Sequence, residues 1–141
     1  MEIANVKRRV QETIDRAKRT AAERRALTAE ATKEYDAFLE QIAVPIFRQV
    51  ANVLRAQSYL FTVFTPGGSV RLMSDRAAED YIELVLDTTG IQPAVIGHAS
   101  RLRGRRITES EQPLRAGPIR ELTEDDVLGF VLKELEPLVE K

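Results

Sequence analysis

The feature that most constrains this chain is its first third, which contains neither glycine nor proline from Glu2 to Ala43. Ala, Glu, Arg and Lys dominate this stretch, and all four are strong helix formers. Apolar or small residues recur at steps of three or four, apart from one gap of six, which predicts a long amphipathic helix with a narrow stripe. The stripe comprises Ile3, Val6, Val10, Ile14, Ala17, Ala21, Leu27, Ala31, Tyr35, Phe38, Ile42 and Ile46.

Pro45 interrupts this helical pattern. Proline lacks a backbone N–H and its ring clashes with the preceding turn, so it should kink the helix or start a second one. The apolar periodicity then continues to about Gln57. We therefore predict a helical stalk and oligomerisation segment over residues 1–57 and a small head domain over residues 58–141.

The predicted helix is too long for the rest of the chain to cover its apolar stripe. A helix over residues 2–43 would be about 63 Å long, whereas the remaining ~85 residues would fold into a globule about 30 Å across. The N-terminal half should therefore project, and an exposed apolar stripe needs a partner. The simplest partner is a second copy in a coiled-coil-like dimer. The predicted interface is Ile3, Val6, Val10, Ile14, Ala17, Ala21, Leu27 and Ala31.

Two observations count against a regular coiled coil. An alanine-rich seam buries little area, and the stripe drifts from strict heptads toward a longer repeat. The alternatives are that this half frays or that it binds a different protein.

Residues 58–114 have the composition of a β-sheet. Apolar and polar residues alternate from Tyr81 to Asp87, and short turn-like connections separate the segments, which predicts an antiparallel meander. The expected strands are residues 58–64, 69–73, 81–87, 94–101 and 105–112. The first should be buried, and the last, with Ile107 as its only large apolar residue, should be a charged edge.

The C-terminal segment carries the signals of a helix that begins after Thr123, a natural N-cap followed by three acids. Leu122 and Val127 have the spacing of a hydrophobic staple. The broad apolar face of this helix should pack on the sheet, so the predicted fold class is α+β.

Composition restricts the class of protein. The chain is 43% hydrophobic and 30% charged with a net charge of -1, which is typical of a globular protein without a global preference for nucleic acid or membrane. It has no cysteine, which fits a reducing compartment. The N-terminus lacks a secretory h-region and no apolar run is long enough to span a bilayer. We expect a cytoplasmic protein with no membrane contact.

Charge is distributed unevenly along the chain. Residues 1–25 carry eight basic and four acidic side chains, and residues 119–141 carry three basic and seven acidic ones. Such asymmetry favours docking between copies or onto a charged partner. The alternative is two ordinary solvated helix faces.

A second basic feature is the sequence RLRGRR, which spans residues 101–106. Gly104 suits a tight hairpin turn, and arginines at a hairpin tip can contact phosphates. The candidate phosphate or nucleic-acid contacts are Arg101, Arg103, Arg105 and Arg106, with Arg115 and Arg120 expected nearby. The alternative is a solvated or protein-docking tip, because the acidic TESEQ segment could neutralise it and no aromatic residues accompany it.

No catalytic motif is present. His98 is the only histidine, so it has no second histidine or cysteine with which to form a metal site or nucleophile pair. Asp125 and Asp126 are explained by the first turn of a helix. We expect no cofactor, no metal and no enzymatic activity.

Two functions from different classes follow from these patterns. The first is a non-enzymatic, self-associating adaptor with a further protein partner in a cytoplasmic complex. The second is a small dimeric nucleic-acid-binding protein that uses the arginine hairpin together with the basic N-terminal helix, where Lys7, Arg8, Arg9, Arg16, Lys18 and Arg19 lie.

Overall fold

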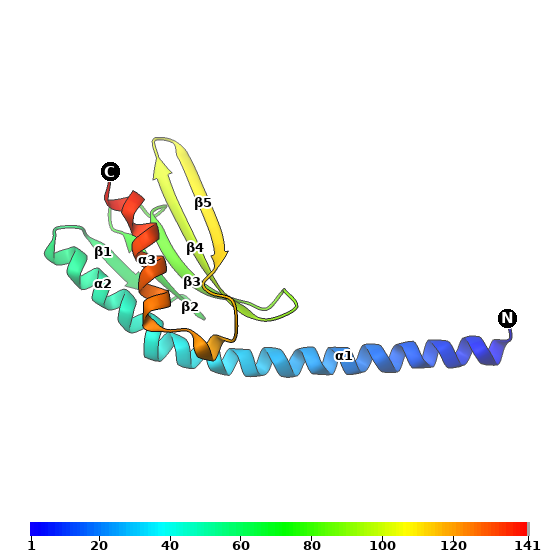
Figure 1. Ribbon diagram of the computed structural model, residues 1–141. Helices are drawn as coiled ribbons and strands as arrows, with labels where there is room; N and C mark the ends of the chain where they lie inside the picture. The colour runs from blue at the N-terminus through cyan, green and yellow to red at the C-terminus, as the bar shows by residue number, and fades with distance from the viewer. Residues whose placement is uncertain (141) are drawn as a thin grey trace.

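The computed structural model describes residues 1–140, so Lys141, the last residue of the predicted head, lies outside the described residues. Three helical segments follow one another without a break: α1 (Ile3–Phe38), the π-helical turn η1 (Leu39–Ala43) and α2 (Val44–Ala56). Figure 1 shows α1 projecting far beyond the rest of the molecule, with α2 inclined to it. The predicted long helix and its change of direction near Pro45 are therefore confirmed.

The π-helical turn has a local cause. Pro45 is at the start of α2 and has no N–H to donate to the carbonyl four residues earlier. A wide turn just before the proline accommodates that lost hydrogen bond, because π-turns insert an extra residue into a helix. The turn also rotates the apolar face of α2 relative to α1.

Helix α2 ends in a reversal that replaces the first part of the predicted strand 58–64. Ser58 adopts a positive φ of 70°, its N–H donates to the Arg55 carbonyl, and the Tyr59 N–H donates to the Leu54 carbonyl. This is a Schellman cap with serine at the position that usually holds glycine. Strand β1 (Phe61–Phe64) therefore begins later than predicted.

The prediction that this first strand is buried holds only in part, because Phe61 belongs to the core and Val63 packs against it, whereas other apolar residues of the segment are exposed. Strand β1 pairs only with β2 and forms one edge of the sheet, so Leu60 and Phe64 stay exposed. The apolar run resembled an interior strand because composition alone does not reveal which strands have two neighbours.

The sheet is the predicted antiparallel meander of five strands in the order β1-β2-β3-β4-β5. The remaining strands are β2 (Ser69–Ser74), β3 (Tyr81–Asp87), β4 (Ala94–Arg103) and β5 (Arg106–Pro113). Strand β5 is the second edge, and it is polar and almost fully exposed, as predicted.

Helix α3 (Glu124–Val139) packs with α2 over one face of the sheet. Its N-terminus carries a capping box, in which the Thr123 hydroxyl accepts from the Asp126 N–H and the Asp126 carboxylate accepts from the Thr123 N–H. Leu122 and Val127, the predicted staple pair, are both buried. The short 3-10 helix η2 (Ile119–Glu121) precedes this cap.

One hydrophobic core joins the helices to the sheet. Its innermost members from the sheet are Val70, Leu72, Ile82 and Leu84. The helical segment before residue 58 contributes Ala31, Tyr35, Phe38, Ala43, Ile46, Phe47, Val50, Ala51 and Leu54. The segment from residue 31 to residue 54 is thus part of the same core as the sheet, although it lies within the predicted stalk range 1–57.

Candidate functional site

The first candidate surface is the apolar stripe along the projecting part of α1. Ile3, Val6, Val10 and Ile14 are all exposed, from 42% for Ile14 to 86% for Ile3, and Figure 1 shows this half of the helix standing clear of the head. Ala17 and Ala21 continue the stripe on exposed positions. The role of these residues in an interface stays a prediction.

The predicted stripe changes character as it reaches the head. Leu27 is exposed, whereas Ala31 is only 7% exposed because it belongs to the chain's own core. Ala31 is therefore covered within one copy, unlike the rest of the predicted interface. Ile91, in the loop between β3 and β4, lines a small pocket with Leu27 and adds exposed apolar surface that sequence periodicity could not reveal.

Polar contacts join the last part of α1 to the rest of the head. The Tyr35 hydroxyl donates to the Gly68 carbonyl at 2.6 Å, and burial raises the pKa of Tyr35, which keeps the donated proton in place. Arg120 and Glu34 form an ion pair at 3.6 Å. These contacts fix the direction in which α1 leaves the head.

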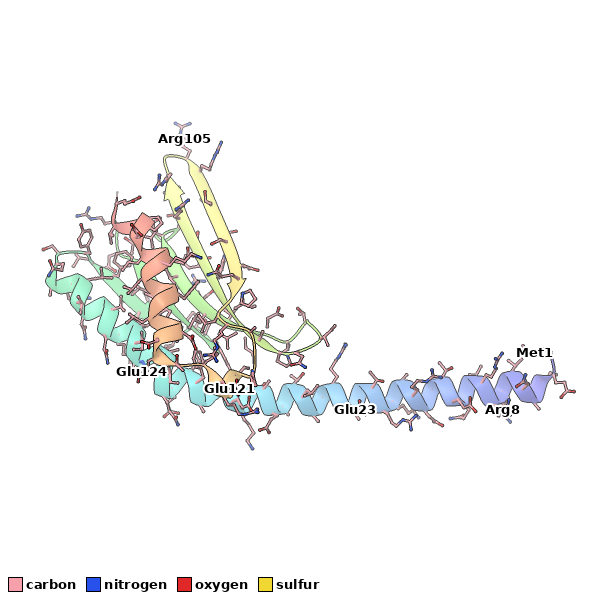
Figure 2. The ribbon with its side chains drawn as sticks, viewed as in Figure 1. Met1, Arg8, Glu23, Arg105, Glu121 and Glu124 are labelled. Atoms are coloured by element: carbon pink, nitrogen blue, oxygen red, sulfur yellow. The ribbon has the colours of Figure 1, made fainter. Side chains whose placement is uncertain are left out.

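The arginine-rich segment forms a tight hairpin between β4 and β5. The sequence favours a four-residue turn over residues 102–105, with Arg103 and Gly104 at its centre. In the structure Arg103 pairs with Arg106 across the strands, so the two central residues are Gly104 and Arg105, one residue later. Gly104 has a φ of 62°, which suits the first central position of a type II′ turn. In Figure 2, Arg105 extends from the tip of the hairpin, away from the head.

The four candidate arginines are brought together at this end of the head, but their surroundings differ. Arg103 lies 3.5 Å from Glu140, near the C-terminus of α3, where the helix dipole favours a cation. Arg101 is half-buried beside Glu134 in a shallow pocket. In residues 1–140, Arg101, Arg105 and Arg106 have no carboxylate within ion-pair distance, and the TESEQ acids do not neutralise them.

The expected proximity of Arg115 and Arg120 to this hairpin is wrong. Arg115 pairs with Asp126 at 3.0 Å in the first turn of α3, whereas the hairpin lies near the last turn of that helix. Sixteen helical residues separate the two ends by about 24 Å. Sequence proximity misled here because strand β5 carries the chain from the hairpin along the head to its other end, where α3 begins (Figure 1).

The face of the sheet opposite the helices carries a polar cluster that the sequence analysis missed. Glu83 is only 7% exposed and accepts from Arg71 Nε at 3.0 Å and from the Ser69 hydroxyl at 3.3 Å. The Arg71 guanidinium stacks on Tyr81 with 4.0 Å between its carbon and the ring centroid. His98 meets the edge of the Tyr81 ring, with 5.4 Å between centroids.

This cluster has the character of a structural network. The buried carboxylate of Glu83 is satisfied by charged and hydroxyl donors from the neighbouring strand. Burial raises the pKa of Tyr81, so that ring stays neutral. The imidazole of His98 lies 4.0 Å from Glu83 and 3.9 Å from Glu109. The only feature of the sequence that pointed to this network was Glu83 itself, a charged residue within the largely apolar strand of residues 81–87.

Asp125 and Asp126 lie where the helix-dipole argument placed them, in the first turn of α3. A hydrogen bond from the Thr123 backbone lowers the pKa of Asp126. Within residues 1–140, no group of three or more His, Asp or Glu side chains is placed to hold a metal ion. None of the helices described has both the length and the apolar character needed to cross a bilayer.

Comparisons of this chain with protein-family models, with curated proteins and with solved structures found no match. The class that the geometry defines is an α+β protein with an antiparallel five-stranded sheet and a projecting N-terminal helix.

Proposed function

We propose that this protein is a non-enzymatic, self-associating interaction protein of a cytoplasmic assembly, and that its stalk, residues 3–30 of α1, contacts a second copy. The observation that carries the proposal is the exposed stripe of branched aliphatic side chains on a helix that the head does not cover. Burying one such side chain contributes about 1.5–3 kcal/mol, so several together can hold two copies.

The local properties of the stalk support this proposal. An isolated helix gains little stability in water from intrinsic propensity alone. The side-chain pairs along the stalk are exposed: an Arg8–Glu12 ion pair at 4.0 Å and hydrogen bonds from Arg8 to Asn5 and from Gln11 to Asp15. Such pairs contribute a few tenths of a kcal/mol each. A partner that buries the stripe would stabilise the first half of the helix, which stands clear of the head (Figure 1).

We expect the triple variant Val6→Asp, Val10→Asp, Ile14→Asp to be monomeric at concentrations where the unmodified chain is an oligomer. Each substitution places a charge on the stripe, which cannot be buried without a partner charge. Sedimentation equilibrium from micromolar to several hundred micromolar measures the mass.

The matched control is Ala4→Asp, Gln11→Asp, Ala22→Asp, which adds the same charge to other faces of the same helix and should still associate. An unmodified chain that stays monomeric over the whole concentration range would rule out self-association.

The second candidate function is nucleic-acid binding, favoured by the hairpin tip where Arg105 and Arg106 have no carboxylate partner among the described residues. Arg103 faces the like charge of Arg106 across the strands. Of the two, only Arg103 has a carboxylate partner within residues 1–140, Glu140, so an anion bound near Arg106 would relieve the remaining repulsion.

On this alternative, the double variant Arg105→Glu, Arg106→Glu should bind single- or double-stranded DNA or RNA at least tenfold more weakly at low salt. The logarithm of affinity of the unmodified chain should fall linearly with the logarithm of salt concentration, because bound phosphates release counterions. Fluorescence anisotropy at several salt concentrations measures both. Arg48→Glu, Arg55→Glu on α2 is the control of equal charge, and lack of binding by the unmodified chain at low salt excludes this function.

A further inference from the structure

An apolar groove runs between α2 and α3 on the outer surface of the head. It has a volume of about 260 Å³. Gln49 is the one polar residue in its lining, and the others are Ile46, Val50, Val53, Leu54, Leu128, Leu132 and Leu135. Val53 is 65% exposed and Leu132 is 51% exposed. An exposed apolar groove between two helices is a surface that can accept the apolar face of an amphipathic helix.

We infer that this groove receives the N-terminal part of the stalk of a second copy, with Val6, Val10 and Ile14 as the anchoring side chains. The inference rests on the proposed self-association and names the surface that the stripe contacts. The two copies exchange stalks reciprocally, because a one-way contact would propagate into an open chain instead of closing as a dimer.

The dimensions of the two surfaces agree. Val6 and Ile14 are eight residues apart, as are Ile46 and Leu54 on the α2 side of the groove, and each interval spans about 12 Å of helix. The anchors recur at steps of four, which places them on one face of the helix. The stripe therefore presents about the length of apolar surface that the groove can cover.

The charges next to the two surfaces are complementary. On α3, Asp125 and Glu136 lie three or four positions from Leu128 and Leu132, so they border the groove. On the stalk, Lys7 and Arg9 lie on either side of the apolar stripe. The α2 border is uncharged, because Arg48 and Arg55 lie on the opposite side of that helix. Basic residues beside the stripe and acidic residues along the α3 border of the groove favour this pairing.

The stalk of the same copy cannot fill this groove. Helix α1 runs without a break from Ile3 to Phe38, so Val6 lies about 48 Å along a straight helix from Phe38, the last residue of α1. Figure 1 shows the N-terminus on the far side of the molecule from α2. Pairing of two stalks is the competing arrangement, but its seam would include Ala17 and Ala21, which bury little surface compared with the leucines of the groove.

Two double variants separate these arrangements. The stripe variant is Val6→Asp, Val10→Asp, and the groove variant is Val53→Asp, Leu132→Asp. All four positions are exposed in one copy, so both variants should keep the melting temperature of the monomer. We expect the dissociation constant of the dimer to rise at least tenfold in each variant, measured by sedimentation equilibrium.

The matched controls carry the same added charge on the same helices. They are Ala4→Asp, Gln11→Asp for the stalk and Asn52→Asp, Lys133→Gln for α2 and α3. Each control pair lowers the net charge by as much as its test variant does, and both should associate like the unmodified chain. If the groove variant also associates normally while the stripe variant is monomeric, self-association through the stalk stands and the groove inference is overturned. A monomeric unmodified chain overturns both.

A cross-linking experiment tests the contact directly, since the chain has no cysteine of its own. A Val10→Cys chain is mixed with a size-tagged Val53→Cys or Leu132→Cys chain and oxidised gently. We expect disulfides between the stalk cysteine of one chain and the groove cysteine of the other to predominate, because only cysteines within a few ångströms can bond. Disulfides only between two Val10→Cys chains, or none at all, would overturn the inference.

Discussion

A chain that begins at residue 27 is expected to fold, whereas a chain that begins at residue 58 is expected to stay unfolded. The first truncation removes only the part of α1 that projects into solvent. The second also removes the helical segment from Ala31 to Leu54, whose apolar side chains belong to the core of the head. The contrast tests where the structural boundary between stalk and head lies.

The magnitude of the second effect follows from burial. Phe47 is fully buried and Tyr35 is 2% exposed, and losing one large core side chain typically costs about 2–5 kcal/mol. A domain of this size has a total free energy of unfolding of about 5–15 kcal/mol. The free energy lost by removing the whole segment is therefore larger than the total free energy of unfolding of the domain.

Circular dichroism and urea unfolding of the two truncated chains measure these outcomes. The melting temperature of the chain from residue 27, followed by circular dichroism, should lie within a few degrees of that of the full chain. The two chains are compared at a concentration where the full chain is monomeric, so that association does not add to its stability. A cooperative unfolding transition in the chain from residue 58 would contradict the shared core.

The substitution Gly97→Val is expected to destabilise the protein by about 3 kcal/mol or more, at the upper end of what overpacking a core costs. Gly97 lies in β4 directly beneath the ring of Phe130 from α3, and a Cβ atom at this position would be 2.4 Å from the Phe130 Cζ atom. Phe130 is itself buried, so the ring cannot move aside without disturbing the contact between α3 and the sheet.

Thermal and urea unfolding measure the loss of stability. Gly129→Ala is the control on the adjacent helix position, where an added Cβ meets nothing within 4 Å and should stabilise α3 by up to about 1 kcal/mol. In a Phe130→Ala background the cost of Gly97→Val should fall sharply, because the clash is removed. Equal costs in the two backgrounds would show that the close approach of Phe130 is not the cause.

Most of the fold was predictable because the signals are local. Strand β3 has the predicted limits Tyr81 and Asp87, since alternation sets a strand directly. Thr123 caps α3 as predicted, because an N-cap needs only a side chain and the next backbone turn. Strand β1 is only partly buried, with Phe61 in the core and Phe64 exposed. Its place at the edge of the sheet depends on which strands lie beside it, which no local pattern contains.

The candidate surfaces were predictable only in part. The stripe from Ile3 to Ile14 is a periodic feature of one helix, and the arginine hairpin is a feature of one turn. The network around Glu83 and the positions of Arg115 and Arg120 depend on which strands and helices lie next to each other. These contacts join residues far apart in the chain, so spacing carries no information about them.

The sequence by itself determined that the first helix must extend beyond its own head, because helix length depends only on a local run of residues and the head has too few residues to cover it. Only the tertiary structure decided that Ala31 ends the exposed stripe and that α2 belongs to the core. It also decided that Val53 and Leu132 face each other across an open groove. The reason is packing, because which side of α2 and α3 stays uncovered depends on how both helices rest on the sheet.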